Sequence, residues 1–441
     1  MTSGSSARLA IVVSHPTQYY SPWFRWLAQH TRLNIRVFYL WNFGVTEQRD
    51  PKFATTFKWD LDLLSGYESE FVPNAAKSPG PEHFRGFDNP TLTSRVAAWR
   101  PNAVLLFGYA WASHLRMIAW ARLHRVPLLF RGDSHFLGRG RPSLRTRLLL
   151  GTLYAQCSAF LVVGAANLEY YTALGVPGRK LFFAPHAVNH ELFDPNTPSH
   201  QEAAAALRSQ LGLRPETRVV LFAGKLVPAK QPRELLEAYL RQQRPDTALV
   251  FVGDGPEKPA LQAMAGAATS DHAGPSTSSA GPSTIDYRPS TSPSSGVQGP
   301  VSMVHGPAYP VHGPSVHFLP FANQSEMPGR LLLADIFALP SRGHYETWGL
   351  AVNEAMHMGV PALVSDRVGC QRDLVKPGET GWVFEAANLG SLDEQLGVAL
   401  AAITRPAERE RLRSNTTALV RQYTYTQTTA GLLQGLEHVL R

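Results

Sequence analysis

Short apolar runs alternate with helical patterns along most of this chain of 441 residues. Unbroken apolar runs between polar turns are typical of strands buried on both faces of a parallel sheet, and the helices between them form the crossovers. The predicted strands cover residues 9–13, 35–40, 104–107, 127–130, 160–163, 181–183, 218–223, 248–252, 316–318, 336–339 and 362–364. Because one core rarely grows to this size, we predict an α/β protein of two Rossmann-like, doubly wound domains that face each other across a cleft.

The strand pattern restarts after residue 198, which sets the predicted domain boundaries. We expect an N-terminal domain over residues 1–200 and a C-terminal domain over 201–420. A last helix over 421–441 has the N-terminal domain as its candidate packing surface. Residues 266–315 are mostly Ser, Thr, Pro and Gly, and such a composition cannot repay the entropy of ordering. They are therefore predicted to form a disordered surface insertion.

The chain is basic, with a formal net charge of +8 and a sequence pI near 9.5, so its partners are expected to be anionic. Nucleic acid is not expected among them, because the sequence has no zinc-finger spacing, RNA-binding aromatic strand motif or lysine-rich tail.

Cys157 and Cys370 are far apart, no apolar run is long enough to cross a bilayer, and the first residues lack a charged leader. These features predict a cytoplasmic protein.

Basic residues are densest at Arg139, Arg141, Arg145 and Arg147, just before three consecutive leucines at residues 148–150. A helix of this kind is suited to rest on anionic lipid, which predicts a peripheral contact at the inner face of a membrane. The alternative is a solvated helix face with a buried apolar stripe. The sequence alone leaves both interpretations open.

Two carboxylates, Glu346 and Glu354, bracket a turn and the first turn of a helix predicted over residues 350–358. Gly349 removes a side chain where backbone would approach a ligand, and Gly359 provides a C-terminal cap. The N-terminus of such a helix favours an anion, while the carboxylates accept hydrogen bonds from hydroxyls. A nucleotide sugar offers both groups. Alternatively, the glutamates only complement the helix dipole.

Lys225 and Lys230 lie in a loop that leaves a predicted strand and precedes a predicted helix. Ligands of parallel sheets bind at such loops, so the two ammonium groups are placed to neutralise two linked phosphates. The alternative is a pair of solvated lysines. The loop is not a P-loop, because the Gly-x4-Gly-Lys-Ser/Thr pattern is absent.

Several motifs follow one another in the second half of the chain. They are Phe-Ala-Gly-Lys-Leu-Val at 222–227, Val-Gly-Asp-Gly-Pro at 252–256, Phe-Leu-Pro-Phe at 318–321, Ala-Asp-Ile-Phe-Ala-Leu-Pro-Ser at 334–341, and Glu-Thr-Trp-Gly-Leu to Glu-Ala at 346–355. From residue 218 to about 385, apart from the insertion, the chain resembles the retaining glycosyltransferases of family 4, which have the GT-B fold. The resemblance implies transfer of a sugar from a UDP- or GDP-sugar to an acceptor hydroxyl with retention of configuration. It implies a place in surface polysaccharide, glycolipid or glycoconjugate synthesis, without a metal or other cofactor.

The resemblance also assigns roles to single positions of the donor site. Lys225 and Lys230 match the pair that holds the diphosphate, although the family more often has Arg at the first. Glu346 matches the ligand of the donor sugar and Glu354 that of the ribose. The remaining implied donor contacts are the sugar and phosphate cradle, Thr347, Trp348, Gly349 and Leu350, and the nucleobase loop, Phe321 and Asn323.

The N-terminal half matches the family less closely. Residues 15–20, His-Pro-Thr-Gln-Tyr-Tyr, stand where the family has a glycine-rich loop, so aromatic side chains are expected to shape acceptor access. His135 is the candidate that faces the reaction centre, with Asp133 close to it. Together with Glu346 they form the predicted catalytic set. The alternative is that Asp133 caps a turn and His135 is exposed.

Two patterns could suggest a metal site. Asp60 and Asp62 form the Asp-x-Asp of another glycosyltransferase fold, but no matching strand order surrounds them, so a chance match is the better interpretation. The histidines in and beside the insertion are irregularly spaced and are predicted to be solvated: His272, His305, His312 and His317. Two other functions stay open, namely a sugar-nucleotide 2-epimerase of the same fold and a non-catalytic GT-B binding subunit.

Overall fold

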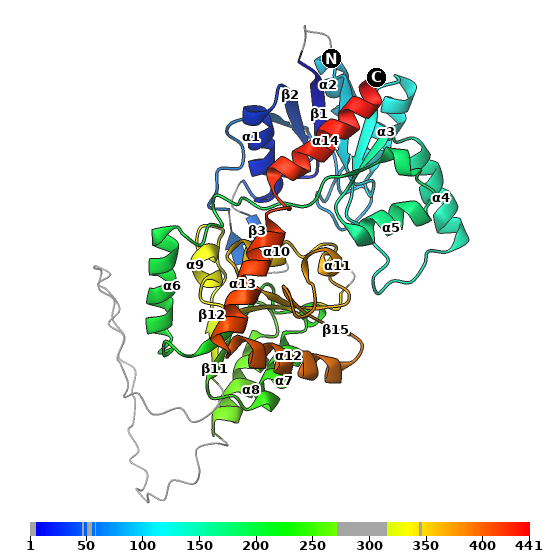
Figure 1. Ribbon diagram of the computed structural model, residues 1–441. Coiled ribbons are helices and arrows are strands. Elements are labelled where there is room, and N and C mark those ends of the chain that lie inside the picture. The colour runs from blue at the N-terminus through cyan, green and yellow to red at the C-terminus, as the bar shows by residue number, and fades with distance from the viewer. Residues whose placement is uncertain (1–5, 46–47, 51–54, 58, 271–314, 344–345) are drawn as a thin grey trace, which may run out of the picture.

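The computed structural model describes residues 6–45, 48–50, 55–57, 59–270, 315–343 and 346–441, and it has two parallel sheets (Figure 1). The strands are β1 Arg8–Val13, β2 Asn34–Tyr39, β3 Gln48–Asp50, β4 Thr55–Phe57, β5 Glu68–Phe71, β6 Ala103–Phe107, β7 Leu128–Arg131, β8 Ala159–Val162, β9 Leu181–Phe183, β10 Arg218–Ala223, β11 Thr247–Val252, β12 Ser315–Leu319, β13 Ile336–Leu339, β14 Ala362–Ser365 and β15 Gly381–Phe384. The N-terminal sheet has the order β5-β2-β1-β6-β7-β8-β9 and the C-terminal sheet the order β12-β11-β10-β13-β14-β15. The two-domain α/β architecture agrees with the prediction.

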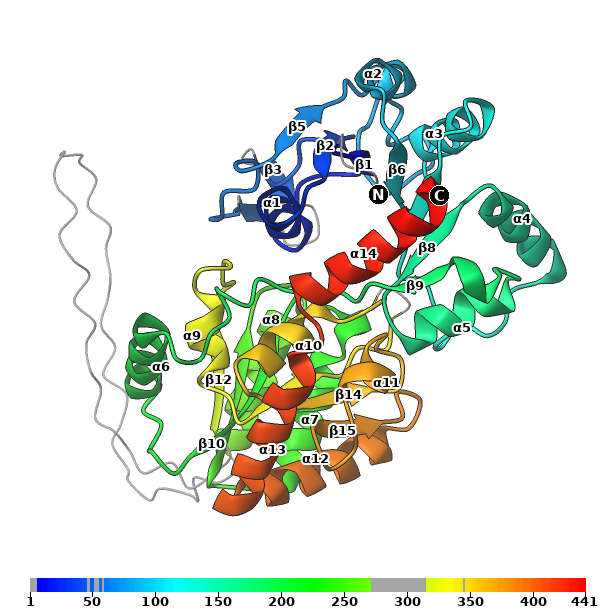
Figure 2. The ribbon, with the colours of Figure 1, turned by 45° about the horizontal axis from the view of Figure 1, so that its top comes forward.

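Helices connect the strands. They are α1 Tyr20–His30, α2 Leu92–Trp99, α3 Ala112–Leu123, α4 Leu144–Ala155, α5 Ala165–Ala173, α6 Pro198–Gln210, α7 Pro232–Gln242, α8 Lys258–Ser270, α9 Met327–Leu331, α10 Leu350–His357, α11 Gln371–Leu374, α12 Leu389–Ile403, α13 Pro406–Val420 and α14 Tyr425–Leu440. Side chains of α2 to α5 cover one face of the N-terminal sheet, while α1 and α14 cover the other (Figure 2). In the C-terminal sheet α9, α10 and α13 pack on one face and α7, α8 and α12 on the other.

Alternate residues of the central strands enter opposite cores. In β1, Ala10 and Val12 belong to one core cluster of the N-terminal domain and Ile11 to the other. In β10, Leu221 and Phe222 are divided in the same way between the two faces of the C-terminal sheet. Burial on both faces explains the unbroken apolar runs of the sequence.

Each predicted strand overlaps an observed one, and the strands that the sequence missed lie at edges. β5 is an edge strand of Glu-Ser-Glu-Phe, and β15, at the far edge of its sheet, begins with Gly381. Edge strands face solvent on one side, so their sequences carry charges or glycine and lack an apolar run. The short antiparallel pair of β3 and β4 was also not predicted.

The last helix, α14, crosses to the N-terminal domain and contacts β8, β9 and α1 (Figure 1). The N-terminal domain is therefore built from the first part of the chain and its final helix. At the predicted insertion 266–315, α8 continues to Ser270 and β12 begins at Ser315, so both ends of that range are regular structure. Its other residues, with His272, His305 and His312, lie outside the described residues, whereas His317 is in β12. Within the parts of the chain that the structure describes, no helix has both the length and the apolar character to span a bilayer.

Candidate active site

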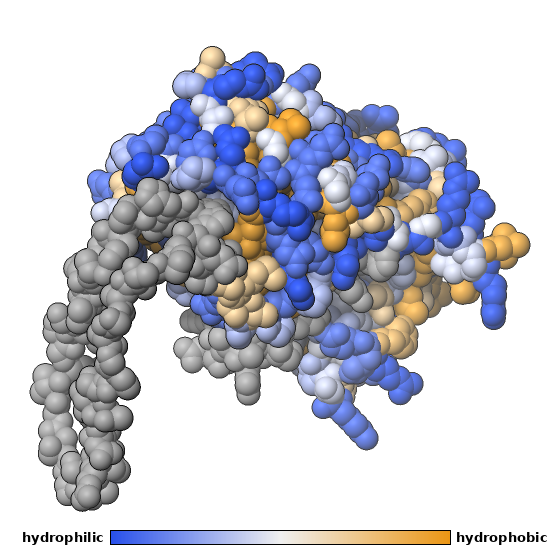
Figure 3. Space-filling model, turned by 90° about the horizontal axis from the view of Figure 1, so that it is seen from below, coloured by the Kyte–Doolittle hydropathy of each residue, from blue (hydrophilic) through white to orange (hydrophobic). Residues whose placement is uncertain are grey.

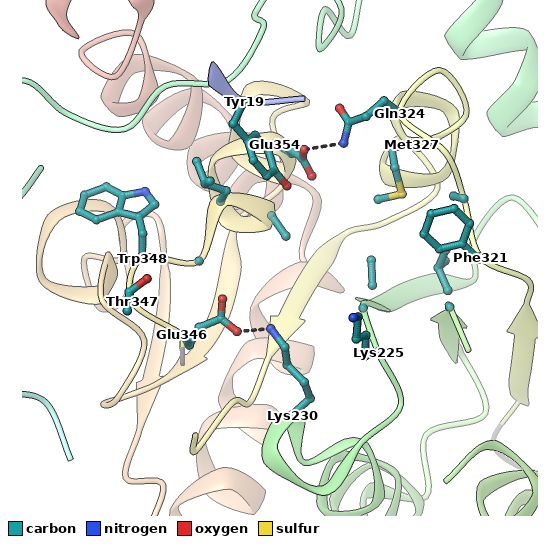
Figure 4. Close-up of a pocket in the computed structure, with 18 of the residues that line it drawn as sticks. Tyr19, Lys225, Lys230, Phe321, Gln324, Met327, Glu346, Thr347, Trp348 and Glu354 are labelled. Carbon is teal, nitrogen blue, oxygen red and sulfur yellow. Dashed lines mark hydrogen bonds and ion pairs between the residues drawn. The ribbon is translucent and has the colours of Figure 1, made fainter. Parts of the chain in front are cut away.

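A cavity of about 380 Å³ lies between the domains, at the carboxyl ends of the C-terminal strands (Figure 4). Most of its wall comes from the C-terminal domain, and the N-terminal domain contributes Tyr19, Trp59 and Asp133. The lining includes ten of the predicted site residues: Asp133, Lys225, Lys230, Phe321, Glu346, Thr347, Trp348, Gly349, Leu350 and Glu354. The fold therefore gathers the motifs of the second half around one hollow.

Two glycines at neighbouring strand ends line one side of this cavity. Gly224 follows β10 and Gly253 follows β11, and the residues before them, Ala223 and Val252, are paired in the sheet. A Cβ on Gly253 would lie 2.1 Å from the carbonyl oxygen of Gly224, and its φ of +137° is strained for any other residue. This surface can therefore only be backbone, which lets a ligand approach closely.

Gly349 begins the helix that points into the cavity. Its φ is +98°, and a Cβ there would lie 2.8 Å from Cγ1 of Val368, so both conformation and space require glycine. The next two residues, Leu350 and Ala351, are at the start of α10 and line the cavity. The first amides of a helix have no acceptor within it, and together with the helix dipole they favour an anion.

Lys230 and Glu346 face each other across the cavity and form an ion pair (Figure 4). Lys230 is the last residue of a short 3₁₀ turn, Pro228–Lys230, and Glu346 precedes Gly349. Lys225 lies on the same side as Lys230, just after β10 (Figure 4). Two ammonium groups and a helix N-terminus are thus directed at one hollow, a combination suited to two linked phosphates.

Glu354 is 3% exposed and lies on the inward face of α10. Nε2 of Gln324 donates to its Oε1 at 3.1 Å, and the Tyr19 side chain lies beside the same carboxylate (Figure 4). Burial raises the pKa of Glu354 to about 7, although the neighbouring Gln324 and Tyr19 act in the opposite direction. The carboxyl group is therefore poised to change its charge near neutral pH.

Asp133 comes from the loop after β7 and reaches across the domain boundary. Oγ1 of Thr347 donates to its Oδ2 at 2.7 Å, and Nε2 of His186 lies 3.8 Å from the same oxygen. Burial would raise the pKa of Asp133, but the nearby His186 ring and the hydrogen bond from Thr347 outweigh this effect and lower it to about 2. The cavity wall therefore carries a permanent negative charge on its N-terminal side.

His135 is 4% exposed, not exposed as the alternative interpretation would have it. Its Nδ1 accepts from the amide of Leu137 at 3.1 Å, which leaves Nε2–H to donate to the Glu346 carbonyl at 3.4 Å. The ring packs behind the Glu346 backbone and is not among the residues that line the cavity. Of the two N-terminal candidates, Asp133 is the one that lines the cavity.

Asn323 is also outside the lining. Its Oδ1 accepts from the amides of Asp60, at 3.4 Å, and Gln324, at 3.1 Å, so it connects the two domains near the cavity. The next residue, Gln324, points inward instead, as do Met327 and Phe321 (Figure 4). Of the two residues predicted in this loop, Phe321 therefore lines the cavity and Asn323 does not.

The two carboxylates of the Asp-x-Asp pattern point to separate partners. Asp60 accepts hydrogen bonds from the amide and hydroxyl of Ser325, while Asp62 accepts from the amides of Leu64 and Ser65. Among the described residues, no group of three or more His, Cys, Asp or Glu side chains is arranged to hold a metal ion.

Comparison with known proteins gives matches in sequence and in fold. Residues 204–272 and 312–418 match the family model described as Glycosyl transferases group 1. The chain is 26% identical over 319 residues to a D-inositol 3-phosphate glycosyltransferase of Jonesia denitrificans, which covers 70% of this chain and 64% of that protein. It is 29% identical over 247 residues to a GDP-mannose-dependent alpha-(1-6)-phosphatidylinositol monomannoside mannosyltransferase of Mycolicibacterium smegmatis, covering 54% and 52%. The matched region therefore spans between about half and two thirds of the length of these relatives.

The fold has close structural counterparts. The crystal structure of Anabaena HepE in complex with UDP and glucose superimposes with a TM-score of 0.64, covering 98% of this chain and 99% of that one at 15% identity. At that identity the similarity concerns the fold alone. It confirms the predicted architecture of two Rossmann-like domains facing across a cleft, the GT-B fold.

Proposed function

We propose that this chain is a glycosyltransferase of the group 1 family, which residues 204–272 and 312–418 match, and that it moves a sugar from a nucleotide diphosphate sugar to an acceptor hydroxyl. The donor is a UDP- or GDP-sugar, and the configuration at the transferred carbon is retained, as the family resemblance implies. The observation that carries the proposal is the convergence of Lys225, Lys230 and the α10 N-terminus on one interdomain cavity.

The diphosphate would lie between the two lysines and the start of α10. As the bond from the sugar to the diphosphate breaks, negative charge develops on the leaving oxygen. The ammonium groups and the amides of Leu350 and Ala351 are preorganised to stabilise that charge, and no metal or other cofactor is needed. Glu346 pairs with Lys230 across the cavity, so a donor would replace this ion pair with a phosphate contact to Lys230 and a sugar hydroxyl contact to Glu346.

The other lining residues fit the remaining parts of the donor. Glu354 would accept hydrogen bonds from the ribose hydroxyls, and Glu346 from those of the sugar. Phe321 offers an aromatic face to the nucleobase, and Asn323 stays a prediction for the same loop. Thr347, Trp348, Gly349 and Leu350 would form the cradle around the sugar and diphosphate.

On the acceptor side, Asp133 would orient the acceptor hydroxyl, because it is ionised and lines the cavity. His135 would act through the Glu346 backbone that it contacts, which makes it a positioning residue in this scheme. We place the acceptor among glycolipid, polysaccharide or glycoconjugate hydroxyls. The names of the two relatives suggest inositol phosphate and phosphatidylinositol mannoside as the first acceptors to try. A cytoplasmic location, where nucleotide sugars are made, fits this function.

A donor panel tests the proposal. UDP and GDP are first compared by thermal shift, since the nucleotide that binds the folded protein raises its melting temperature. The matching sugar nucleotides are then incubated with and without the acceptors, and free nucleoside diphosphate is measured. Release that depends on the acceptor supports transfer. An altered sugar nucleotide would instead indicate a 2-epimerase, and binding without turnover a non-catalytic subunit.

A further inference from the structure

Helices α3 and α4 of the N-terminal domain carry a surface that the proposed reaction does not use. Its apolar members are five leucines with unusually exposed side chains: Leu115 at 40%, Leu123 at 78%, Leu144 at 71%, Leu148 at 64% and Leu149 at 71%. We call this the leucine face. The apolar stripe of the alternative interpretation is present on α4, where Leu150, Leu153 and Tyr154 pack against the core. It does not account for the leucine face, because Leu144, Leu148 and Leu149 stay exposed.

A groove of about 690 Å³ runs between the two helices beneath these leucines. Its lining is largely aliphatic and includes Leu115, Ile118 and Leu123 from α3 and Leu148 and Leu149 from α4. Figure 3 shows apolar side chains projecting at the right-hand edge, the side on which α4 lies in Figure 1, next to hydrophilic ones. An exposed apolar patch of this kind marks an interaction site.

The segment that carries the leucine face is almost entirely positive, although one of its arginines, Arg116, is paired with Asp88 from outside it. The segment from residue 112 to 156 holds eight arginines and one acidic residue, a formal charge of +7, whereas the whole chain carries +8. The acidic residue is Asp133, which lies in the interdomain cavity, and Arg131 beside it is buried. The other arginines are exposed: Arg116, Arg122, Arg125, Arg139, Arg141, Arg145 and Arg147.

We propose that the leucine face and its arginines dock this protein on an anionic lipid bilayer. Leu144 and Leu148 are four residues apart on α4 and, with Leu149, insert at the level of the acyl chains. The arginines contact the lipid phosphates, to which their guanidinium groups can bind in bidentate fashion. A second copy of the chain is a poorer occupant, because two such faces would bring their arginines together.

Binding to vesicles tests this surface without any substrate. Full-length protein is mixed with vesicles of phosphatidylcholine alone or of equal parts phosphatidylcholine and phosphatidylglycerol, and bound protein is measured by flotation. We expect binding to the anionic vesicles only, weakening as salt is added. Replacing Leu144, Leu148 and Leu149 together by Gln should lower the partition coefficient by at least about tenfold.

A control replaces three exposed leucine or valine side chains elsewhere, Leu168, Leu389 and Val398, by Gln. This control should bind vesicles like the wild type. A second variant, Arg141→Gln with Arg145→Gln, should bind more weakly and lose much of the salt dependence. Nucleotide-induced thermal shift should be unchanged in every variant, because the leucine face is outside the cavity.

Three results would overturn the proposal. The wild type could fail to bind anionic vesicles at low salt, or the leucine variant could bind as well as the control. The leucine variant could also convert a dimer into a monomer in sedimentation analysis, which would assign the face to a second copy. None of these results bears on the donor site, which thermal shift with UDP or GDP reports separately.

Discussion

The carboxyl edges of the two sheets face the same cavity but are built from different residues. On the C-terminal side, glycines end β10 and β11 and start α10, so backbone and two lysines are presented to a ligand. On the N-terminal side, the loop after β1 has no glycine and leads into an aromatic cluster. One fold thus provides one edge suited to close approach of an anion and another suited to contact with a bulkier, less charged group.

The aromatic cluster shows this difference in detail. The rings of Trp41 and Phe43 are stacked with centroids 4.6 Å apart, and His15 meets Trp41 edge-on at 5.8 Å. Burial lowers the pKa of His15 to about 4, so the ring is neutral at physiological pH. Trp59, which lines the cavity, also lies against Gly44, whose Cβ would be 3.0 Å from the indole. At matched strand ends, the comparison predicts that a Cβ after β11 is more damaging than one after β6.

The largest expected effect comes from two matched glycines at strand ends. Gly253→Ala would force a Cβ to within 2.1 Å of the Gly224 carbonyl, so we expect the free energy of unfolding to fall by more than about 4 kcal/mol. Gly108 follows β6 in the N-terminal domain, and its nearest neighbour to a Cβ is 3.6 Å away. Gly108→Ala should therefore cost only about 1 to 2 kcal/mol, from its φ of +87°. Denaturant unfolding followed by circular dichroism compares them, and equal losses would contradict the comparison.

The second effect is the pH dependence of the unfolding free energy, to which Glu354 and Asp133 contribute with opposite signs. The folded pKa of Glu354 is about 7 against an ordinary 4.5, so its protonated form is favoured by folding. Its contribution to stability is complete below pH 4.5 and is lost as pH rises to 7, a fall of about 3 kcal/mol. Glu354→Gln should remove this part of the slope, so that stability falls less than in the wild type between these pH values.

Asp133 should show the reverse behaviour. Its folded pKa is about 2 against an ordinary 3.8, so its contribution is present above pH 3.8 and is lost as pH falls towards 2. The slope should be shallower than a fully buried group would give, because the side chain is 39% exposed. Thermal melts of wild type, Glu354→Gln and Asp133→Asn across this range measure both slopes. A Glu354→Gln profile identical to that of the wild type would show that folding does not raise the pKa of Glu354.

The third effect is on the Kd for the nucleotide, and it compares Lys230 from the C-terminal edge with His15 from the N-terminal edge. Lys230→Met removes a charge-assisted contact to the diphosphate and leaves Glu346 without its partner, so the Kd for UDP or GDP should rise about tenfold to hundredfold. His15→Gln should leave that Kd unchanged, because His15 contacts aromatic residues of the N-terminal domain. Calorimetry gives both constants. Equal weakening in the two variants would mean that the nucleotide spans both edges.

Much of the C-terminal edge could be predicted because its chemistry is local in sequence. The loop with Lys225 and Lys230 follows one strand directly, and Glu346, Gly349 and Glu354 lie within nine residues of one another. Glycine positions, helix start and charge could all be assigned from neighbouring residues. The structure brings these segments together simply because parallel strands end at one edge of the sheet.

The contacts between domains could not be predicted in this way. Tyr19 lines the cavity beside Glu354 of the other domain, and no sequence spacing indicates that pairing; its expected role in acceptor access stays a prediction. Gln324 rather than Asn323 faces the cavity, a difference of one residue in a loop whose register depends on Asp60 of the other domain. His135 was placed near the reaction centre, and the packing of its ring behind Glu346 follows from the domain interface. Such facts depend on how two separately folded units meet.

The smallest effect concerns the hydrogen bond that joins the two edges. Thr347→Val removes the hydroxyl that donates to Asp133 and keeps the shape of the side chain and the backbone of the cradle. We expect a loss of about 1 kcal/mol in unfolding free energy, together with a rise in the pKa of Asp133, because one of the hydrogen bonds that lower it is gone.

In catalysis the same variant separates the two edges. Donor binding depends on lysines and backbone amides, which Thr347→Val leaves in place, so the Kd of the nucleotide should not change. Transfer needs the domains held together with Asp133 directed at the acceptor, so kcat should fall by about fivefold, the equivalent of about 1 kcal/mol. Thr380→Val is the control, because that buried threonine bonds only within the C-terminal domain among the described residues. A loss of nucleotide affinity in Thr347→Val without a change in kcat would show that the threonine belongs to the donor edge, and that the two edges do not meet through it.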